Sequence, residues 1–308
     1  MTHQTRTDRG LYWDRAWTLV QGCTKVSTGC AHCWAERESA MRKHNPLVAE
    51  HHEGLTDEAG HWTGAIRTRR DNLLAPRRAT KSWTWSVWND LFHRNVPMPF
   101  FAQAMDTMAV AAGQTFLVLT KRPERIAPMI EEMMGNWPEG CPANSYLYAH
   151  TYLPNVWWGT TVENQSVLID RMTELLKVPG HHFLSVEPML SHVDLTPYLW
   201  RCECGARPFD DGMQHWRFDG ARWQHYHGYP IGHVDCEPSG AIDWVVAGPE
   251  TGAQRRHIDL SAFHNLAWQC RVAGVPLFIK KLESDGTPTA NMGRWPDDLR
   301  IRQYPAGV

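Results

Sequence analysis

TFLVLTKRPER, residues 115–125, is a short uncharged run that ends in a group of charged residues and a proline. An apolar run of this length is typical of a strand that is buried on both faces of a parallel sheet. The pattern recurs at 17–23 (WTLVQGC), 83–93 (WTWSVWNDLFH), 156–164 (VWWGTTVEN), 182–188 (HFLSVEP), 242–252 (IDWVVAGPETG) and 275–283 (VPLFIKKLE). The sequence therefore predicts a set of parallel, buried strands.

Helical patterns lie between these runs. Apolar residues recur at three- and four-residue spacing, and three of the stretches end at a glycine suited to a helix C-cap. They are PFFAQAMDTMAVAAG (99–113), PERIAPMIEEMMG (123–135), QSVLIDRMTELLKV (165–178) and LSAFHNLAWQCRVAG (260–274). Alternation of strand and helix predicts an α/β fold, a partial or full βα (TIM-like) barrel with parallel strands over 1–195 and 241–290. An open doubly wound sheet is less favoured, because it usually carries a Gly-rich phosphate loop and this chain shows none.

Reactive side chains cluster where the predicted strands end. In a βα barrel the loops after the strands converge on one face, and that face carries the chemistry. The residues at or just past strand ends are Cys23, Asp90, His93, Lys121, Arg122, Glu163, Glu187, Glu250 and Lys280. Each alone could be a surface charge or part of a rim ion pair, but seven strand ends with one pattern predict a functional face.

Three cysteines follow the first strand, in VQGCTKVSTGCAHCW (20–34). Cys23, Cys30 and Cys33 have the spacing C-x6-C-x2-C, and the glycines before Cys23 and Cys30 allow the loop to fold tightly. The chain has eight cysteines and no apolar leader, so metal or cluster ligation is favoured over disulfides. Spacing leaves two possibilities: a structural zinc, with His32 or a distant residue as fourth ligand, or a 4Fe-4S cluster with one open iron.

The order of the motifs resembles the radical S-adenosylmethionine (SAM) superfamily, whose partial βα barrels hold a three-cysteine cluster after the first strand. More closely, the chain is similar to a phage-associated, largely uncharacterised three-cysteine family. The resemblance rests on GCTKVSTGCAHCWAE, NDLFHRNVP, LTKRPERI, LPNVWWGTTVEN, FLSVEPML, IDWVVAGPETG and GVPLFIKK, within residues 17–283. The chain differs from the superfamily in its six-residue first gap and in lacking a Gly-Gly-Glu motif after the second strand.

This resemblance implies a 4Fe-4S cluster on Cys23, Cys30 and Cys33, whose open iron binds SAM and starts hydrogen-atom abstraction from a substrate. An electron donor such as a flavodoxin or ferredoxin is then an expected partner. Residues expected to contact SAM are Trp34, Asn89, Asp90, Glu187 and Glu250. Residues expected to serve catalysis or hold an anionic group of the substrate are Asp90, His93, Lys121, Arg122, Glu163 and Lys280.

A second cysteine group lies in the insertion at 196–240. Cys202 and Cys204, followed by His233 and Cys236, form a plausible zinc knuckle, although other histidines of the insertion compete with His233. The insertion is too short and polar to bury a core of its own, so a metal would explain its folding. Residues 291–308 are expected to form a C-terminal tail.

Charge and composition limit the expected partners. A net charge of −2 argues against a tight nonspecific nucleic-acid binder, but the segment 67–81 is basic and the chain has 16 tryptophans. These features lean towards a nucleotide or nucleic-acid base as substrate. No run long enough for a membrane span and no signal-peptide core is evident, so a cytoplasmic location without membrane contact is expected.

Two other functions fit the same residues. The first is a non-catalytic, zinc-stabilised nucleic-acid-binding protein in which both cysteine groups are structural. The second is a metal-dependent hydrolase on the same barrel, which would use Asp90, His93 and the strand-end glutamates.

Overall fold

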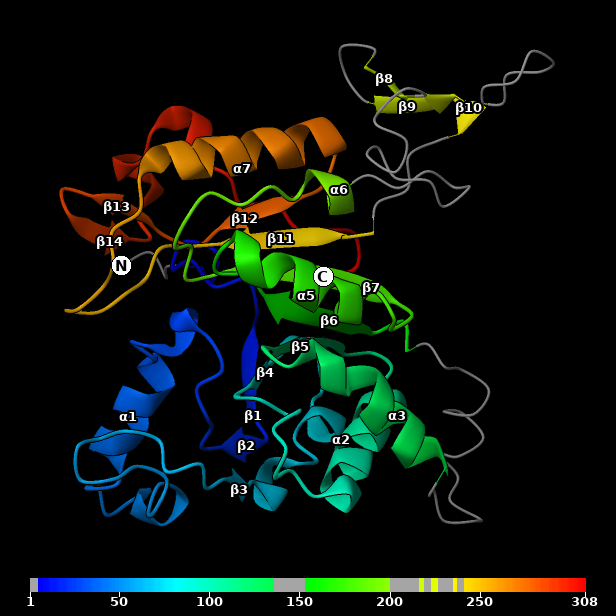
Figure 1. Ribbon diagram of the computed structural model, residues 1–308. Coiled ribbons are helices and arrows are strands. Elements are labelled where there is room, and N and C mark those ends of the chain that lie inside the picture. The colour runs from blue at the N-terminus through cyan, green and yellow to red at the C-terminus, as the bar shows by residue number, and fades with distance from the viewer. Residues whose placement is uncertain (1–4, 136–152, 200–215, 219–222, 227–234, 237–240) are drawn as a thin grey trace.

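A seven-stranded parallel sheet forms the centre of the protein (Figure 1). The computed structural model describes residues 5–135, 153–199, 216–218, 223–226, 235–236 and 241–308. Along the sheet the strands are β1 (Arg15–Thr18), β4 (Thr84–Trp88), β5 (Thr115–Thr120), β6 (Val156–Thr161), β7 (His181–Val186), β11 (Trp244–Ala247) and β12 (Leu277–Ile279). Every neighbouring pair is parallel.

Strand order along the sheet follows strand order along the chain. A doubly wound sheet reverses its order at a switch point, whereas a barrel winds in one direction only. This sheet does not reverse; it curls into a half-barrel with β1 and β12 at its edges. The predicted α/β fold with a partial βα barrel is therefore confirmed.

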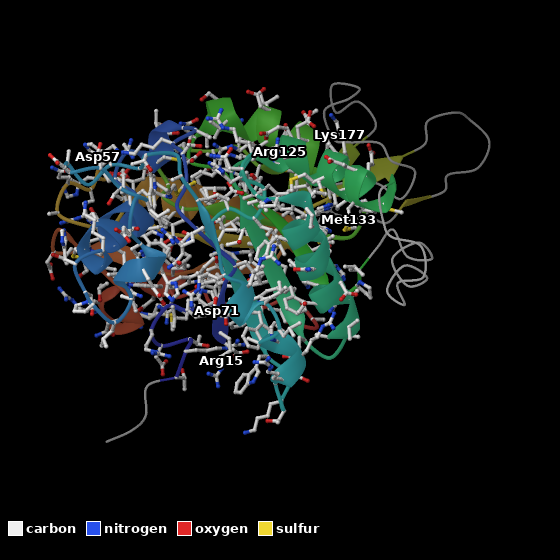
Figure 2. The ribbon with its side chains drawn as sticks, turned by 90° about the horizontal axis from the view of Figure 1, so that it is seen from below. Arg15, Asp57, Asp71, Arg125, Met133 and Lys177 are labelled. Carbon is white, nitrogen blue, oxygen red and sulfur yellow. The ribbon has the colours of Figure 1, made fainter. Side chains whose placement is uncertain are left out.

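Helices cover the outer face of the half-barrel. They are α2 (Met98–Val110), α3 (Ile126–Gly135), α5 (Gln165–Leu175) and α7 (Leu260–Ala273). Their apolar faces join the outward strand residues in one large core, which includes Phe101, Val118, Trp158 and Leu266. Figure 2, a view from below, shows how densely side chains fill this layer; Met133 of α3 is one of the buried ones.

Aromatic residues fill the inner face. Trp157, Phe183, Trp244 and Phe278 alternate with outward residues on their strands and form a second buried cluster with Tyr12. Gly159 is required beside them, because a Cβ at this position would lie 2.3 Å from the Phe183 ring. The sequence does not distinguish the inward from the outward residues of these strands, since both faces of each strand are apolar.

Residues 291–308, expected to form a tail, pack on the free edge of β12. The Ile279 amide donates to the Ile301 carbonyl and the Gln303 amide to the Leu277 carbonyl, each at 2.9 Å. Tyr304 then lies 5.3 Å from the Phe278 ring and 5.7 Å from the Trp244 ring. The C-terminal segment thus covers the edge strand and closes part of the inner aromatic core.

Strand β1 ends at Thr18, earlier than the apolar run at 17–23 suggested. The chain then turns, and β2 (Val20–Gln21) pairs antiparallel with β3 (Arg67–Thr68) outside the main sheet. Helix α1 (Trp34–Arg42) follows the cysteine loop and lies at the left of Figure 1, on the side to which the strand carboxyl ends point. This turn carries the three cysteines over the mouth of the half-barrel.

The remaining elements are small. Strands β13 (Leu282–Ser284) and β14 (Thr287–Thr289) form a hairpin after β12, and α6 (Thr196–Leu199) packs on α7. Within the insertion, β8 (Trp216–Phe218), β9 (Trp223–Tyr226) and β10 (Asp235–Cys236) form an antiparallel sheet. Among the helices described, none has the length and apolar character that crossing a membrane requires.

Candidate functional site

The three cysteines lie on the loop between β2 and α1, above the carboxyl ends of β4 to β7. All three are free and half-buried. The charge of Cys33 raises the pKa of Cys23, and the charge of Cys30 raises the pKa of Cys33, although burial is the largest cause at both. Gly22 starts the loop with a φ of +85°, and a Cβ there would lie 2.2 Å from the Ala65 carbonyl oxygen. The loop therefore needs glycine at this position.

Cys23 contacts the charged residues that follow β4 and β5. Burial raises its pKa to about 11, the Asp90 carboxylate adds to this, and Arg122 opposes it. The Arg122 guanidinium donates to Cys23 Sγ at 3.7 Å and forms an ion pair with Asp90. Asp90 also accepts from Thr120 Oγ1 at 2.7 Å. Arg122 is thus a fixed cation beside the first thiol.

Cys33 is the N-cap of α1. Burial raises the pKa of its thiol, while the nearby backbone N–H groups of Glu36 and Ala35 act to lower it. Amides at a helix start carry partial positive charge and favour an anionic sulfur. The net shift of the Cys33 pKa is upward, so burial disfavours the thiolate more than the start of the helix favours it.

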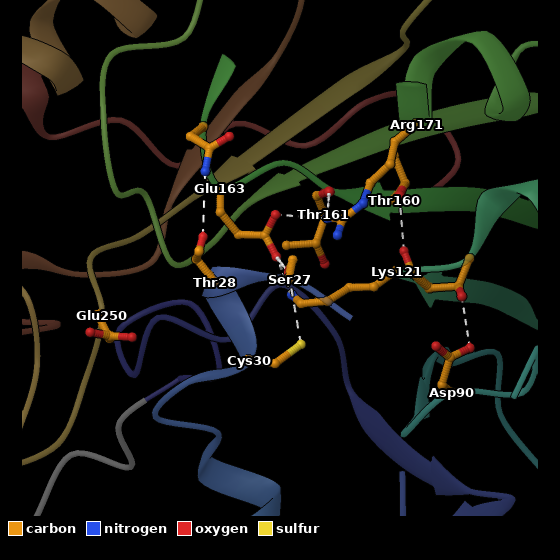
Figure 3. A network of polar contacts seen from close by, with 12 residues as sticks. Ser27, Thr28, Cys30, Asp90, Lys121, Thr160, Thr161, Glu163, Arg171 and Glu250 are labelled. Carbon is orange, nitrogen blue, oxygen red and sulfur yellow. Dashed lines mark hydrogen bonds and ion pairs between the residues drawn. The ribbon is translucent and has the colours of Figure 1, made fainter. Parts of the chain in front are cut away.

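Glu163, after β6, ties the middle of the loop to the barrel (Figure 3). Its fully buried carboxylate accepts from Ser27 Oγ at 2.6 Å and pairs with Lys121 at 3.2 Å and Arg171 at 2.7 Å. Burial raises the pKa of Glu163, but the charges of Lys121 and Arg171 outweigh it and the net shift is downward. Ser27 Oγ also lies 3.8 Å from Cys30 Sγ, so this network reaches the second thiol.

Glu250, after β11, holds the loop from the other side. His32 Nδ1 donates to its carboxylate at 3.0 Å, and Arg256 forms an ion pair with it at 2.5 Å. Burial opposes ionisation, but the Arg256 hydrogen bonds prevail and lower the pKa of Glu250 to about 2. Arg256 also donates to the Thr28 carbonyl at 3.0 Å.

Three strand ends thus hold one loop. Arg122 donates to Thr24 Oγ1 at 2.6 Å and to the Thr24 carbonyl at 2.9 Å, Glu163 binds Ser27, and Glu250 binds His32. Sequence analysis marked the three charged residues and Lys121, but it did not pair any of them with the loop, and it did not mark Arg171 or Arg256. Nothing in the sequence distinguishes Arg171 or Arg256. Arg171 lies in a helical pattern and Arg256 in a loop-like one, and an arginine in either place is usually solvated.

His93 is completely buried below the loop. Its Nδ1 accepts from the Asn95 amide at 3.2 Å, so the neutral ring carries its proton on Nε2 and donates it to Thr24 Oγ1 at 3.2 Å. Burial and the nearby Arg122 lower the pKa of His93, which favours this neutral form. Nε2 therefore contacts the cysteine loop, and Nδ1 holds the ring in place through the Asn95 backbone.

Glu187 and Lys280 form an ion pair across the mouth between β7 and β12. The Lys280 ammonium lies 5.4 Å from the centre of the Tyr12 ring. Both side chains stay partly exposed, unlike Asp90 and Glu163. This pair belongs to the same mouth as the cysteine loop but does not tether it.

Trp34 and Asn89 lie at the β4 side of the loop. The Trp34 ring is half-exposed and stands edge-on to Trp88, with centroids 5.0 Å apart. Asn89 adopts a φ of +61° and donates from Nδ2 to the Val20 carbonyl at 2.6 Å. Trp34 is the large apolar side chain beside Cys33 that remains open to a ligand.

The second cysteine group falls mostly outside the described residues. This holds for Cys202, Cys204 and His233, while Cys236 lies in β10. Zinc binding there stays a prediction. In the basic segment, Arg69 pairs with Asp71 at 2.6 Å and Arg77 pairs with Asp106, so part of its charge is neutralised within the protein.

Metal binding has a separate geometric test. Over the described ranges, no three His, Cys, Asp or Glu side chains are gathered so as to hold an ion as they stand. The thiols share one loop; Arg122 donates to Cys23 Sγ, and α1 begins directly after Cys33. Such donors to sulfur are what a thiolate-held cluster requires from its surroundings.

The fold and site define an α/β half-barrel protein with a three-cysteine loop fixed over its carboxyl-end mouth. Residues 10–297 match the family model described as "Protein of unknown function (DUF5131)", and the chain belongs to this family. No curated protein and no solved structure matches the chain.

Proposed function

We propose that the protein is a radical SAM iron-sulfur enzyme. The observation that carries the proposal is the position of Cys23, Cys30 and Cys33, on one loop over the carboxyl-end mouth of a parallel half-barrel. This is the face on which βα barrels carry their chemistry. A structural zinc clasp would not need to lie there.

The cysteine surroundings support a cluster. Cys23, Cys30 and Cys33 would hold a 4Fe-4S cluster, whose chemistry is the one-electron reductive cleavage of SAM to yield an organic radical. Arg122 beside Cys23 and the positive end of α1 at Cys33 would partly offset the cost of placing negative charge on the buried sulfur atoms. The reduced thiols and this redox chemistry suit the cytoplasm, with a small electron-transfer protein as donor.

The chain's own residues then have distinct roles. Glu163, Arg122 and Glu250 fix the loop through Ser27, Thr24 and His32, so they are positioning residues. Trp34 and the partly exposed pair of Glu187 and Lys280 are available to contact SAM or substrate. Asp90 contributes through Arg122, since its carboxylate already binds that guanidinium.

The test is anaerobic purification and iron-sulfide reconstitution, followed by absorption and EPR spectra with and without SAM. We expect a brown protein whose dithionite-reduced EPR signal changes when SAM is added. A colourless protein that carries only zinc would overturn the proposal and leave the cysteines as a structural clasp.

A pair of variants locates the cluster. Replacing Cys30 and Cys33 together with Ala should reduce bound iron to background while the protein stays folded. Cys270→Ala is the matched control, because this thiol is buried in α7, away from the loop, and its removal should leave iron content unchanged. Equal iron in both variants would refute the assignment.

A further inference from the structure

A large cleft opens beside the cysteine loop, on the side of α5. Its volume is about 760 Å³, within the range of about 300–1,000 Å³ typical of small-molecule sites. One wall is Thr24 to Val26 of the cysteine loop, another is the turn from Lys121 to Arg125, and the third is α5. The cleft therefore shares backbone with the loop that carries the thiols.

Cations dominate the lining of this cleft. Three acids face them: Glu124, Asp170 and Glu174. The cations are Lys25, Arg94, Lys121, Arg122, Arg125 and Arg171. Some of these charges already have partners: Glu174 pairs with Lys177 at 2.7 Å, Lys25 pairs with Glu36 at 2.9 Å, and Arg122 pairs with Asp90.

Two of the cations have no carboxylate partner in the described part of the chain. Arg125 donates to the Phe92 carbonyl at 2.8 Å and to Met129 Sδ at 3.7 Å, which fixes its guanidinium. Arg94 is exposed and makes no ion pair or hydrogen bond among the described residues. Lys121 and Arg171 share the single carboxylate of Glu163. The wall thus keeps a positive excess.

His93 lies near three of these arginines. Burial is the largest cause that lowers its pKa; the charges of Arg122, Arg94 and Arg125 act in the same direction, and Asp90 opposes them. Several separate cations suit a multiply charged anion, whereas a single carboxylate is satisfied by one bidentate arginine.

We propose that this cleft binds the phosphate group of a nucleotide-sized ligand, with Arg94 and Arg125 as its principal contacts. Val26 and Val167 supply apolar surface for the rest of the ligand. The inference rests on the proposed function only in naming this ligand as the substrate; phosphate binding itself needs no cluster. The phosphate could belong to a free nucleotide or to a nucleic-acid strand.

The experiment measures binding to the full-length protein by calorimetry. The probes are adenosine 5′-monophosphate, adenosine, inorganic phosphate and a short single-stranded DNA. We expect the monophosphate to bind more tightly than adenosine, and we expect its affinity to fall as the salt concentration rises. Arg94→Gln should raise the dissociation constant about tenfold, because one charge-assisted contact is lost.

Arg78→Gln is the matched comparison, since Arg78 is an exposed arginine of the basic segment and does not line the cleft. It should leave binding unchanged. Binding of the DNA alone, lost in Arg94→Gln, would support the proposal with a strand as the source of the phosphate. The proposal is overturned when no phosphate probe binds, or when Arg78→Gln weakens binding as much as Arg94→Gln does.

Iron content measured on the same preparations separates the two hypotheses. A brown, SAM-responsive protein that binds no phosphate probe would refute phosphate binding in the cleft and support the radical SAM proposal. A colourless protein that binds the monophosphate through Arg94 would support phosphate binding and refute the radical SAM proposal.

Discussion

Gly29→Ala is the most direct test of the link between the barrel and the cysteine loop. A Cβ at position 29 would lie 2.3 Å from both Cγ and Oε1 of Glu163, where ordinary contacts begin near 3.4 Å. Glu163 has little room to yield, because Ser27, Lys121 and Arg171 hold its carboxylate. Overpacking at a fixed site costs about 1–3 kcal/mol. Loss of the Ser27 hydrogen bond adds about 1 kcal/mol.

We therefore expect Gly29→Ala to lower the free energy of unfolding by about 2–4 kcal/mol in urea titrations and to reduce iron retained after reconstitution. Gly113→Ala is the control, because a Cβ there meets nothing within 4 Å; it should change stability by no more than about 0.5 kcal/mol and leave iron unaffected. Adding Glu163→Asp to Gly29→Ala should recover part of the loss, since the shorter side chain vacates the space. Wild-type stability and iron content in Gly29→Ala would refute the tether.

Three further outcomes follow from the same structure. Because the pKa of Glu250 is lowered to about 2, its ion pair should stabilise the fold above about pH 4.5 and lose that effect as pH falls towards 2. Glu250→Gln should therefore be less stable than the wild type at pH 7, and the stabilities of the two proteins should converge in acid unfolding curves. Since burial raises the pKa of Cys23 to about 11, that thiol must lose a proton to bind metal. Metal uptake should therefore release protons and weaken as pH falls, which calorimetry in two buffers measures. Uptake independent of pH would contradict this. Gly274 caps α7 with a φ of +69°, so Gly274→Ala should cost about 1 kcal/mol in urea titrations despite the open space around it, and a neutral result would show that the cap relaxes.

The local sequence was sufficient to predict an element where a single short segment determines its structure. TFLVLT formed β5, and the charged residues after it turned the chain into α3, because a buried strand excludes charge and the strand must end where charge begins. The same logic placed Asp90, Arg122, Glu163 and Glu250 at one mouth. In contrast, β1 ended early, because pairing of β2 with β3 is a long-range contact that no local pattern reports.

The sequence by itself determined the βα alternation, a parallel βα barrel that could be partial or full, and the gathering of thiols and charges at its carboxyl end, since each depends on periodicity and on where uncharged runs stop. Only the tertiary structure decided which charged residues form ion pairs with one another. Glu163 and Arg122 became tethers of the cysteine loop, while Arg94, which no strand-end rule marks, was left facing a cleft. The physical reason is that a side chain's role depends on its partners in space, and these come from segments more than a hundred residues apart, as with Ser27 and Glu163.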